Sequence, residues 1–153
     1  MAVDPARRAR VNRDLARVML HGRRLGTREQ ERQVSIVCHG AVLDLLRAGV
    51  SVVEDGTNLP DEHLVALWDI ADRAGARFRV ADFTRLPVEV CVARDARREG
   101  AARLGRQVIE GMCRDHLGRR RRPLRVPAMS GTHRGNLVEV VDMTRPGAYL
   151  SSC

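Results

Sequence analysis

Two short runs typical of strands, each preceded by a segment with helical periodicity, constrain the fold of this sequence more than any other feature. The runs lie at residues 50–54 (VSVVE) and 77–82 (RFRVAD). The three valines of the first run favour a strand, as do Phe78 and Val80 in the second. The first run is the more apolar, so we expect it to form a buried strand. Strands that alternate with helices in this way predict an α/β fold, in which helices flank a sheet of parallel strands.

Helices are expected between and around these strands. Apolar residues recur at helical spacing across residues 27–48, and Gly49 suits the C-terminal end of that helix. Pro60 is expected near the first turn of the next helix, with Thr57 or Asn58 as its cap. The other helices are expected at residues 12–20, 60–74, 87–94 and 104–117.

The C-terminal part differs in composition from the rest of the chain. After Gly118 come four consecutive arginines and a stretch that carries Pro, Ser, Thr and Gly without clear periodicity. We therefore divide the chain into a domain at residues 1–117 and a basic linker with a C-terminal tail at residues 118–153.

The charge indicates what kind of partner the chain binds. The sequence has 27 basic and 19 acidic residues, a formal net charge of +8, and every basic residue is an arginine. This excess favours a polyanionic partner such as nucleic acid or nucleotide phosphates. An arginine bias in a GC-rich coding sequence is the alternative, and the sequence leaves it open. No apolar run reaches the length of a membrane span, so we expect a cytoplasmic protein without a membrane partner.

Two carboxylates lie where an α/β fold could use them for chemistry. Asp55 follows the first expected strand, at the carboxyl end where such sheets bind ligands. Asp14 is expected at the start of a helix, with Arg17 one turn later. A carboxylate beside an arginine can accept the proton of a hydroxyl group while the arginine holds a phosphate. The alternative is an acidic residue that stabilises a helix N-terminus and pairs with a surface arginine.

Three segments together resemble the kinase domain of phage-type polynucleotide 5′-hydroxyl kinases. They are N-R-D-L-A-R at residues 12–17, D-G-T-N-L at residues 55–59 and the arginine-rich cluster at residues 94–98. The first segment is the more specific to the polynucleotide branch, whereas many P-loop kinases share the second. The resemblance implies a P-loop-kinase-like parallel sheet flanked by helices, with ATP and Mg²⁺ as cofactors. It also implies the 5′ ends of DNA or RNA as substrates.

The resemblance assigns the acceptor side of such a site to the first two segments. It implies that Asp14 is the general base for the 5′-hydroxyl group. It further implies that Arg13 and Arg17 bind the phosphate of the acceptor nucleotide. Thr57 and Asn58 would shape the edge of the sheet where the substrate binds.

The nucleotide side is assigned to Asp55 and the arginine cluster. The resemblance implies that Asp55 lies near Mg²⁺ or its waters, as a metal and cofactor contact. Arg98 would act in catalysis by neutralising charge on the transferred phosphoryl group, and its neighbour Arg97 would contact the nucleotide. The chain departs from the family next to Asp55, because Gly56 stands where the family has a second acidic residue before Thr-Asn.

A larger departure concerns the phosphate-binding loop. The family uses a strand followed by G-x-x-x-x-G-K-[ST], whose amides and lysine bind the nucleotide phosphates. Only eleven residues precede Asn12 and the chain contains no lysine, so we expect the N-terminal strand and the loop to be missing. Three interpretations stay open: an incomplete polynucleotide kinase domain, a small-molecule kinase of the same superfamily, and a non-catalytic nucleic-acid-binding remnant.

The segment at residues 137–144 (LVEVVDMT) is similar to the start of the phosphatase domain in bifunctional relatives. The nucleophile position would be Val140, which cannot attack a phosphate, so no phosphatase activity is expected. An ordinary edge strand explains the run about as well.

Overall fold

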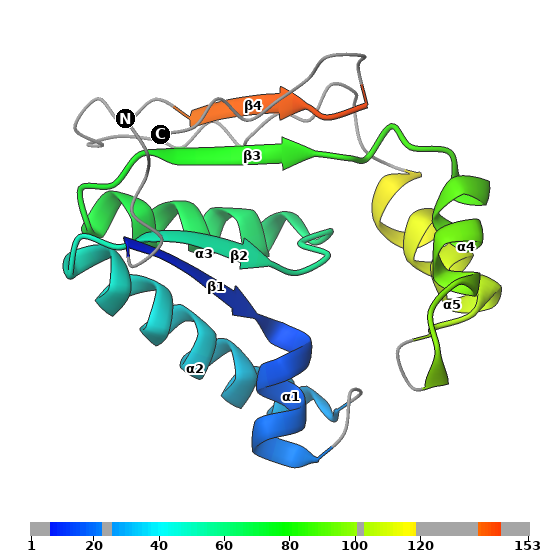
Figure 1. Cartoon of the computed structure of the whole chain (residues 1–153), viewed down its shortest axis with the longest axis horizontal. Helices are drawn as coiled ribbons and strands as arrows, with labels where there is room; N and C mark the ends of the chain where they lie inside the picture. The colour runs from blue at the N-terminus through cyan, green and yellow to red at the C-terminus, as the bar shows by residue number, and fades with distance from the viewer. Residues whose placement is uncertain (1–6, 23–25, 101–102, 119–137, 145–153) are drawn as a thin grey trace.

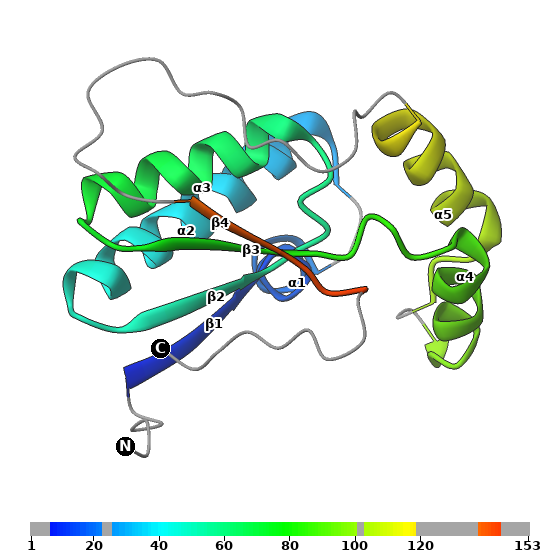
Figure 2. The same cartoon turned by 90° about the horizontal axis from the view of Figure 1, so that it is seen from above.

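The computed structural model describes most of the chain, namely residues 7–22, 26–100, 103–118 and 138–144. Four strands run in the same direction, as their arrows show in Figure 1. Two helices, α2 (Arg28–Arg47) and α3 (Asp61–Arg73), lie on the same side of these strands (Figure 2). The arrangement is an α/β layer with helices packed against one face.

The strands form two parallel pairs. β1 (Arg8–Asn12) pairs with β2 (Ser51–Asp55), and β3 (Phe78–Asp82) pairs with β4 (Val138–Asp142). Within the described part of the chain, no ladder of hydrogen bonds joins one pair to the other. The predicted α/β class with parallel strands is therefore confirmed, whereas the strands are not joined into the single sheet that was expected.

The predicted helices are present, with ends within a few residues of those expected. The first begins one residue late because Asn12, in an extended conformation, is its N-cap and accepts a hydrogen bond from the Leu15 amide at 2.9 Å. The second begins with a capping box between Thr27 and Gln30. The remaining bounds are α1 (Arg13–His21), α4 (Val88–Ala96) and α5 (Arg106–Met112), which continues as a π-helical turn at Cys113–Leu117.

The strand β1 was not predicted from the sequence, and it leads into α1 without the phosphate-binding loop that follows the strand expected to be missing. Its sequence, RARVN, carries three polar residues out of five and gives little strand signal by itself. It forms because its main chain pairs in register with β2. The strand leads directly into α1, so the residues around Asn12 lie at its carboxyl end.

The most deeply buried residues lie where α1 and α2 meet the β1–β2 pair. Val34 and Cys38 of α2 are fully buried, Ala16 of α1 packs against them, and Val11 of β1 lies partly buried on the same cluster. On α3 the following residues are buried along one side: Leu64, Leu67, Trp68 and Ala71. Core packing therefore fixes α1 and α2 relative to the ends of β1 and β2.

The other face of the β1–β2 pair is open. Val53 is 64% exposed, whereas its neighbours Val52 and Glu54 are partly buried. Successive side chains of a strand point to opposite faces, and the helices cover only one of them. The expectation of a buried strand at residues 50–54 is therefore wrong for the outer side chains.

The loop between β2 and α3 also differs from expectation. Pro60, which makes no side-chain cap hydrogen bond, is the N-cap of α3, so the cap predicted at Thr57 or Asn58 is wrong. The side-chain amide of Asn58 instead donates a hydrogen bond to Glu54 (Nδ2–Oε2, 2.5 Å). The backbone of Asn58 has a φ of 43°, a left-handed conformation that asparagine tolerates better than most residues.

The helices α4 and α5 lie beyond the carboxyl ends of the strands, at the side toward which the arrows point in Figure 1. The apolar run expected near the C-terminus forms β4. The run of four arginines, at residues 119–122, lies outside the described residues. None of the helices in the described ranges combines the length and the apolar character that crossing a membrane requires.

Candidate functional site

The carboxyl ends of β1 and β2 bring two of the predicted site segments together. Asn12 lies opposite Asp55 in the ladder, and its side-chain amide donates to the Asp55 carbonyl oxygen at 2.9 Å. Because α1 starts at the next residue, Arg13 and Asp14 follow at this same edge. Segments that are 43 residues apart in sequence thus form one edge, which is where ligands bind in open α/β sheets.

Arg17 lies between two carboxylates. Its Nη1 donates to Asp14 Oδ1 at 2.5 Å, while its Nε and Nη2 donate to the two oxygens of Glu31 at 2.6 and 2.8 Å. The hydrogen bond from Arg17 lowers the pKa of the Glu31 carboxyl, and the same contact raises the pKa of Arg17. The guanidinium is therefore held in place from α2, in the bidentate geometry that orients an arginine best.

Asp14 is more exposed to solvent than its partner Arg17. The side chain of Asp14 is 54% exposed, whereas that of Arg17 is only 20% exposed. The carboxylate therefore faces solvent, where a substrate hydroxyl group could reach it, and the arginine behind it is fixed.

Arg13 is held by the same carboxylate. It is 6% exposed, its Nη2 lies 3.3 Å from Glu31 Oε2, and both Nη atoms donate to Ser35 Oγ at 3.1 Å. Its Nε is buried and has no hydrogen-bond partner among the described residues. Glu31 and Ser35 were not identified from the sequence, although both lie one turn apart near the start of a helix. Glu31 lies in the first turn of α2, where acidic residues are common, so its position in the sequence did not single it out.

The carboxylate of Asp55 is already engaged by a cation. Arg10 of β1 forms an ion pair with Asp55 Oδ2. The Mg²⁺ role implied for Asp55 would require Arg10 to move away, so the carboxylate as it stands does not fit a metal ion. Within the described ranges, no cluster of three or more His, Cys, Asp or Glu side chains is placed to hold a metal ion.

Glu54 is a second acidic group at this edge that sequence reasoning missed. Burial raises the pKa of its carboxyl, although the hydrogen bond from Asn58 opposes the shift. A Cβ atom on Gly56 would lie 3.2 Å from Glu54 Oε1 and 3.3 Å from Asn58 Oδ1. The glycine that departs from the family pattern thus leaves room for the Glu54 carboxyl group. Thr57 is exposed in the same loop.

The arginine cluster lies apart from these residues. Arg98 follows α4 and its Nη1 is 3.8 Å from Asp95 Oδ1, while Arg97 is the C-cap of that helix. Among the described residues, neither arginine has a hydrogen bond or ion pair with Asp14. The structure therefore brings Arg13, Asp14 and Arg17 together and leaves the cluster on a separate unit.

Asp95 organises that separate unit and was also missed. It is 4% exposed and accepts hydrogen bonds from the amides of Leu104 and Gly105 at 3.0 and 2.8 Å. These backbone hydrogen bonds lower the pKa of the Asp95 carboxyl. The carboxylate thus ties the end of α4 to the start of α5.

In comparison with known proteins, no family model matches the sequence, and no curated protein matches it significantly.

Proposed function

We propose that this chain carries the acceptor side of a polynucleotide 5′-hydroxyl kinase site. The observation that carries the proposal is the solvent-facing Asp14 carboxylate, paired with an Arg17 that Glu31 holds from behind. The resemblance of N-R-D-L-A-R to such kinases supports the same assignment. The carboxylate and the arginine lie at the edge of the sheet where an α/β protein binds its ligands.

In the proposed reaction the 5′-hydroxyl oxygen of DNA or RNA attacks the γ-phosphorus of ATP. Asp14 accepts the proton of the hydroxyl group as the new P–O bond forms, and the bond to the β-phosphate oxygen breaks with release of ADP. The proton then leaves Asp14 for solvent. Arg17 keeps the carboxylate oriented and offers positive charge to a phosphate of the acceptor strand.

The ATP side of the proposed site draws on residues beyond the Asp14 edge. The 153 residues contain no lysine and no G-x-x-x-x-G-K-[ST] sequence, so the phosphates of ATP need a loop that these residues do not include. The arginines of the cluster, Arg97 and Arg98, are proposed to reach the nucleotide only after the α4–α5 unit moves toward Asp14.

The experiment that tests this function measures transfer of labelled γ-phosphate to a 5′-hydroxyl oligonucleotide. We expect no transfer by the 153-residue chain alone, and transfer by a fusion that places a strand and a phosphate-binding loop ahead of Ala9. In the fusion, Asp14→Asn is expected to lower turnover about 10²–10⁴-fold, the usual contribution of a general base.

A matched control is Asp44→Asn, which makes the same chemical change on the exposed side of α2 and is expected to keep full turnover. Equal activity of the Asp14 and Asp44 variants would mean that the base has been assigned wrongly. Binding of oligonucleotides without any transfer by the fusion would favour the non-catalytic alternative, which the net charge of +8 also supports.

A further inference from the structure

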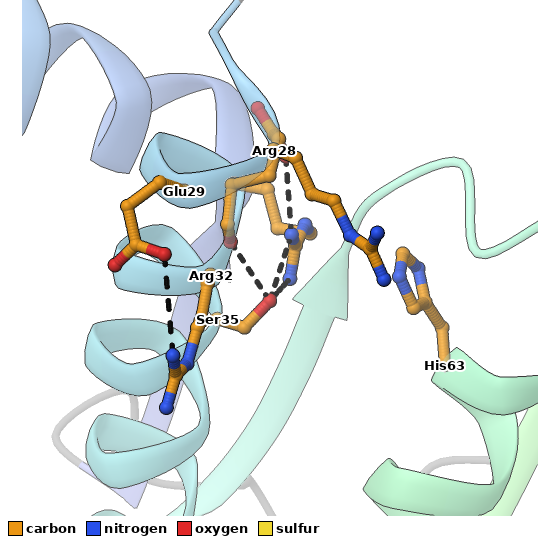
Figure 3. A pocket seen from close by; sticks show the side chains of 7 residues that line it. Arg28, Glu29, Arg32, Ser35 and His63 are labelled. Atoms are coloured by element: carbon orange, nitrogen blue, oxygen red, sulfur yellow. Dashed lines mark hydrogen bonds and ion pairs between the residues drawn. The ribbon is translucent and has the colours of Figure 1, made fainter.

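A pocket of about 740 Å³ opens beside the start of α1, between the first turns of α2 and α3 (Figure 3). Hydrogen-bond donors dominate its lining, and these are Arg13, Arg28, Arg32, Ser35 and His63. Two carboxylates, Glu29 and Glu31, complete the lining. The pocket is thus rich in the groups that bind oxyanions.

The two carboxylates are already paired with arginines other than Arg28. Glu31 is held by Arg17 and Arg13, and Glu29 lies 4.0 Å from Arg32. Arg28 has no ion pair with any described residue. The positive charge of Arg28 is therefore left for a ligand.

Arg28 and His63 approach the same space from different helices. In Figure 3 the guanidinium group of Arg28, from α2, points toward the imidazole ring of His63, from α3. A guanidinium and an imidazole offer only weak attraction to each other, but an anion between them would accept hydrogen bonds from both. The arrangement suits a tetrahedral oxyanion.

The wall of the pocket is built before any ligand arrives. Arg13 is 6% exposed, fixed by Ser35 and Glu31, and its buried Nε has no partner among the described residues. A cation fixed in this way costs a ligand little reorganisation when it binds.

We propose that this pocket is a subsite for one backbone phosphate of the nucleic-acid strand whose 5′ end lies at Asp14. Arg13 and Asp14 are consecutive residues in the first turn of α1, so the pocket and the acceptor carboxylate lie on adjacent sides of one turn. A strand that enters with its 5′-hydroxyl group at Asp14 can place a later phosphate against Arg28 and His63. The nucleic-acid identity of the ligand rests on the proposed function, whereas the affinity for phosphate does not.

The ring of His63 offers a direct report on the pocket. Burial lowers the pKa of His63, and the charges of Arg13 and Arg17 lower it further, while Glu62 and Glu31 act in the opposite direction. Phosphate bound beside the ring would favour the imidazolium form and raise this pKa.

The test follows the His63 ring by NMR in the full chain during titration with inorganic phosphate, and then with a short 5′-hydroxyl oligodeoxynucleotide. We expect both ligands to raise the pKa of His63 and to compete with each other. Arg28→Gln should weaken binding about tenfold, because one charge-assisted contact is lost. The matched control, Arg47→Gln, makes the same charge change at the other end of α2 and should leave binding unchanged.

The outcomes separate this inference from the proposed function. An unchanged His63 titration, or equal weakening by the Arg28 and Arg47 variants, would overturn the pocket as a phosphate site. Phosphate binding that the oligonucleotide does not displace would overturn the assignment to a nucleic-acid strand. Since neither measurement involves ATP or phosphate transfer, a failed kinase assay beside intact phosphate binding contradicts the proposed function alone.

Discussion

Two regions of the molecule, one built from β1, β2, α1 and α2 and the other from α4 and α5, are stabilised by different interactions. Around β1, β2, α1 and α2, a buried apolar cluster is joined to a network of ion pairs centred on Glu31. By contrast, the buried residue of α4 is the charged Asp95, and α5 has no buried residue among those that the structure describes. The first region combines packing with electrostatics, whereas the second depends on polar contacts.

This difference suggests how the proposed site could work. The acceptor residues Asp14 and Arg17 lie in the first region, which we call the well-packed region. Their geometry is therefore fixed without a ligand. Arg97 and Arg98 lie in the region of α4 and α5. Because few apolar side chains are buried there, little packing resists its movement. A fixed acceptor side and a movable arginine unit are what a phosphoryl-transfer site needs if it closes on its nucleotide.

Amide hydrogen exchange tests this difference between the two regions most directly. We expect amides in the middle of α2, around Val34 and Cys38, to exchange at least about 100-fold more slowly than those of α4 and α5, because local opening of α4–α5 exposes little apolar surface. Mass spectrometry of peptic fragments at several exchange times measures the difference. Equal protection of the two regions would show that α4–α5 is as firmly held as α2.

The next largest effect is expected from Glu31→Gln. This change leaves Arg13, which is 6% exposed, and Arg17 without their shared negative charge, so we expect the free energy of unfolding to fall by about 2 kcal/mol. Urea denaturation measures it. The matched control is Glu29→Gln, where the ion pair with Arg32 is exposed and should contribute less than about 0.5 kcal/mol. Similar losses in both variants would remove Glu31 from the centre of the network.

The sequence predicts the helices well because their periodicity and terminal glycines are local signals. Gly22 and Gly49, for example, both adopt the positive φ that suits the residue after a helix. It did not predict β1, because that strand owes its conformation to a partner some 43 residues away. Strand formation that depends on a distant partner leaves little trace in the local sequence.

The candidate site was predicted only in part for a similar reason. Asp14, Arg13 and Arg17 belong to one short motif, and Asp55 follows a recognisable strand. Glu31 and His63 take part because α2 and α3 pack beside that motif, and nothing in the sequence specifies which of their polar residues face it. The pairing of Arg10 with Asp55 depends on the register of an unpredicted strand.

The pH dependence of stability offers a finer test, because the pKa values of two glutamates in the well-packed region are shifted in opposite directions. The pKa of Glu31 is lowered, so its contribution is present above its unfolded-state pKa and is lost as the pH falls through the folded-state pKa. The pKa of Glu54 is raised by burial, so the fold favours its neutral form and loses that contribution as the pH rises.

We therefore expect Glu54→Gln to raise the stability at pH 7 by up to about 1 kcal/mol, since glutamine keeps an acceptor for Asn58 without a buried charge. Glu31→Gln should instead flatten the loss of stability in acid. Thermal unfolding of both variants between about pH 7 and pH 3 measures these effects, a range that spans the ordinary glutamate pKa. A Glu54 variant that is less stable than the parent at pH 7 would show that the charged carboxylate stabilises the loop.

The smallest effect is expected where the loop after β2 departs from the family pattern. A Cβ atom on Gly56 would lie 3.2 Å from Glu54 Oε1 and 3.3 Å from Asn58 Oδ1, which is closer than ordinary contact. Both neighbours are the ends of flexible side chains, so Gly56→Ala should shift them and weaken their hydrogen bond, at a cost of about 0.5–1 kcal/mol. Gly40→Ala, in open space on α2, is the control and should not destabilise the fold, because alanine favours helix over glycine. If Gly56→Ala were as stable as the parent, the hydrogen bond between Glu54 and Asn58 would not restrain the loop, and the well-packed region would end at Asp55.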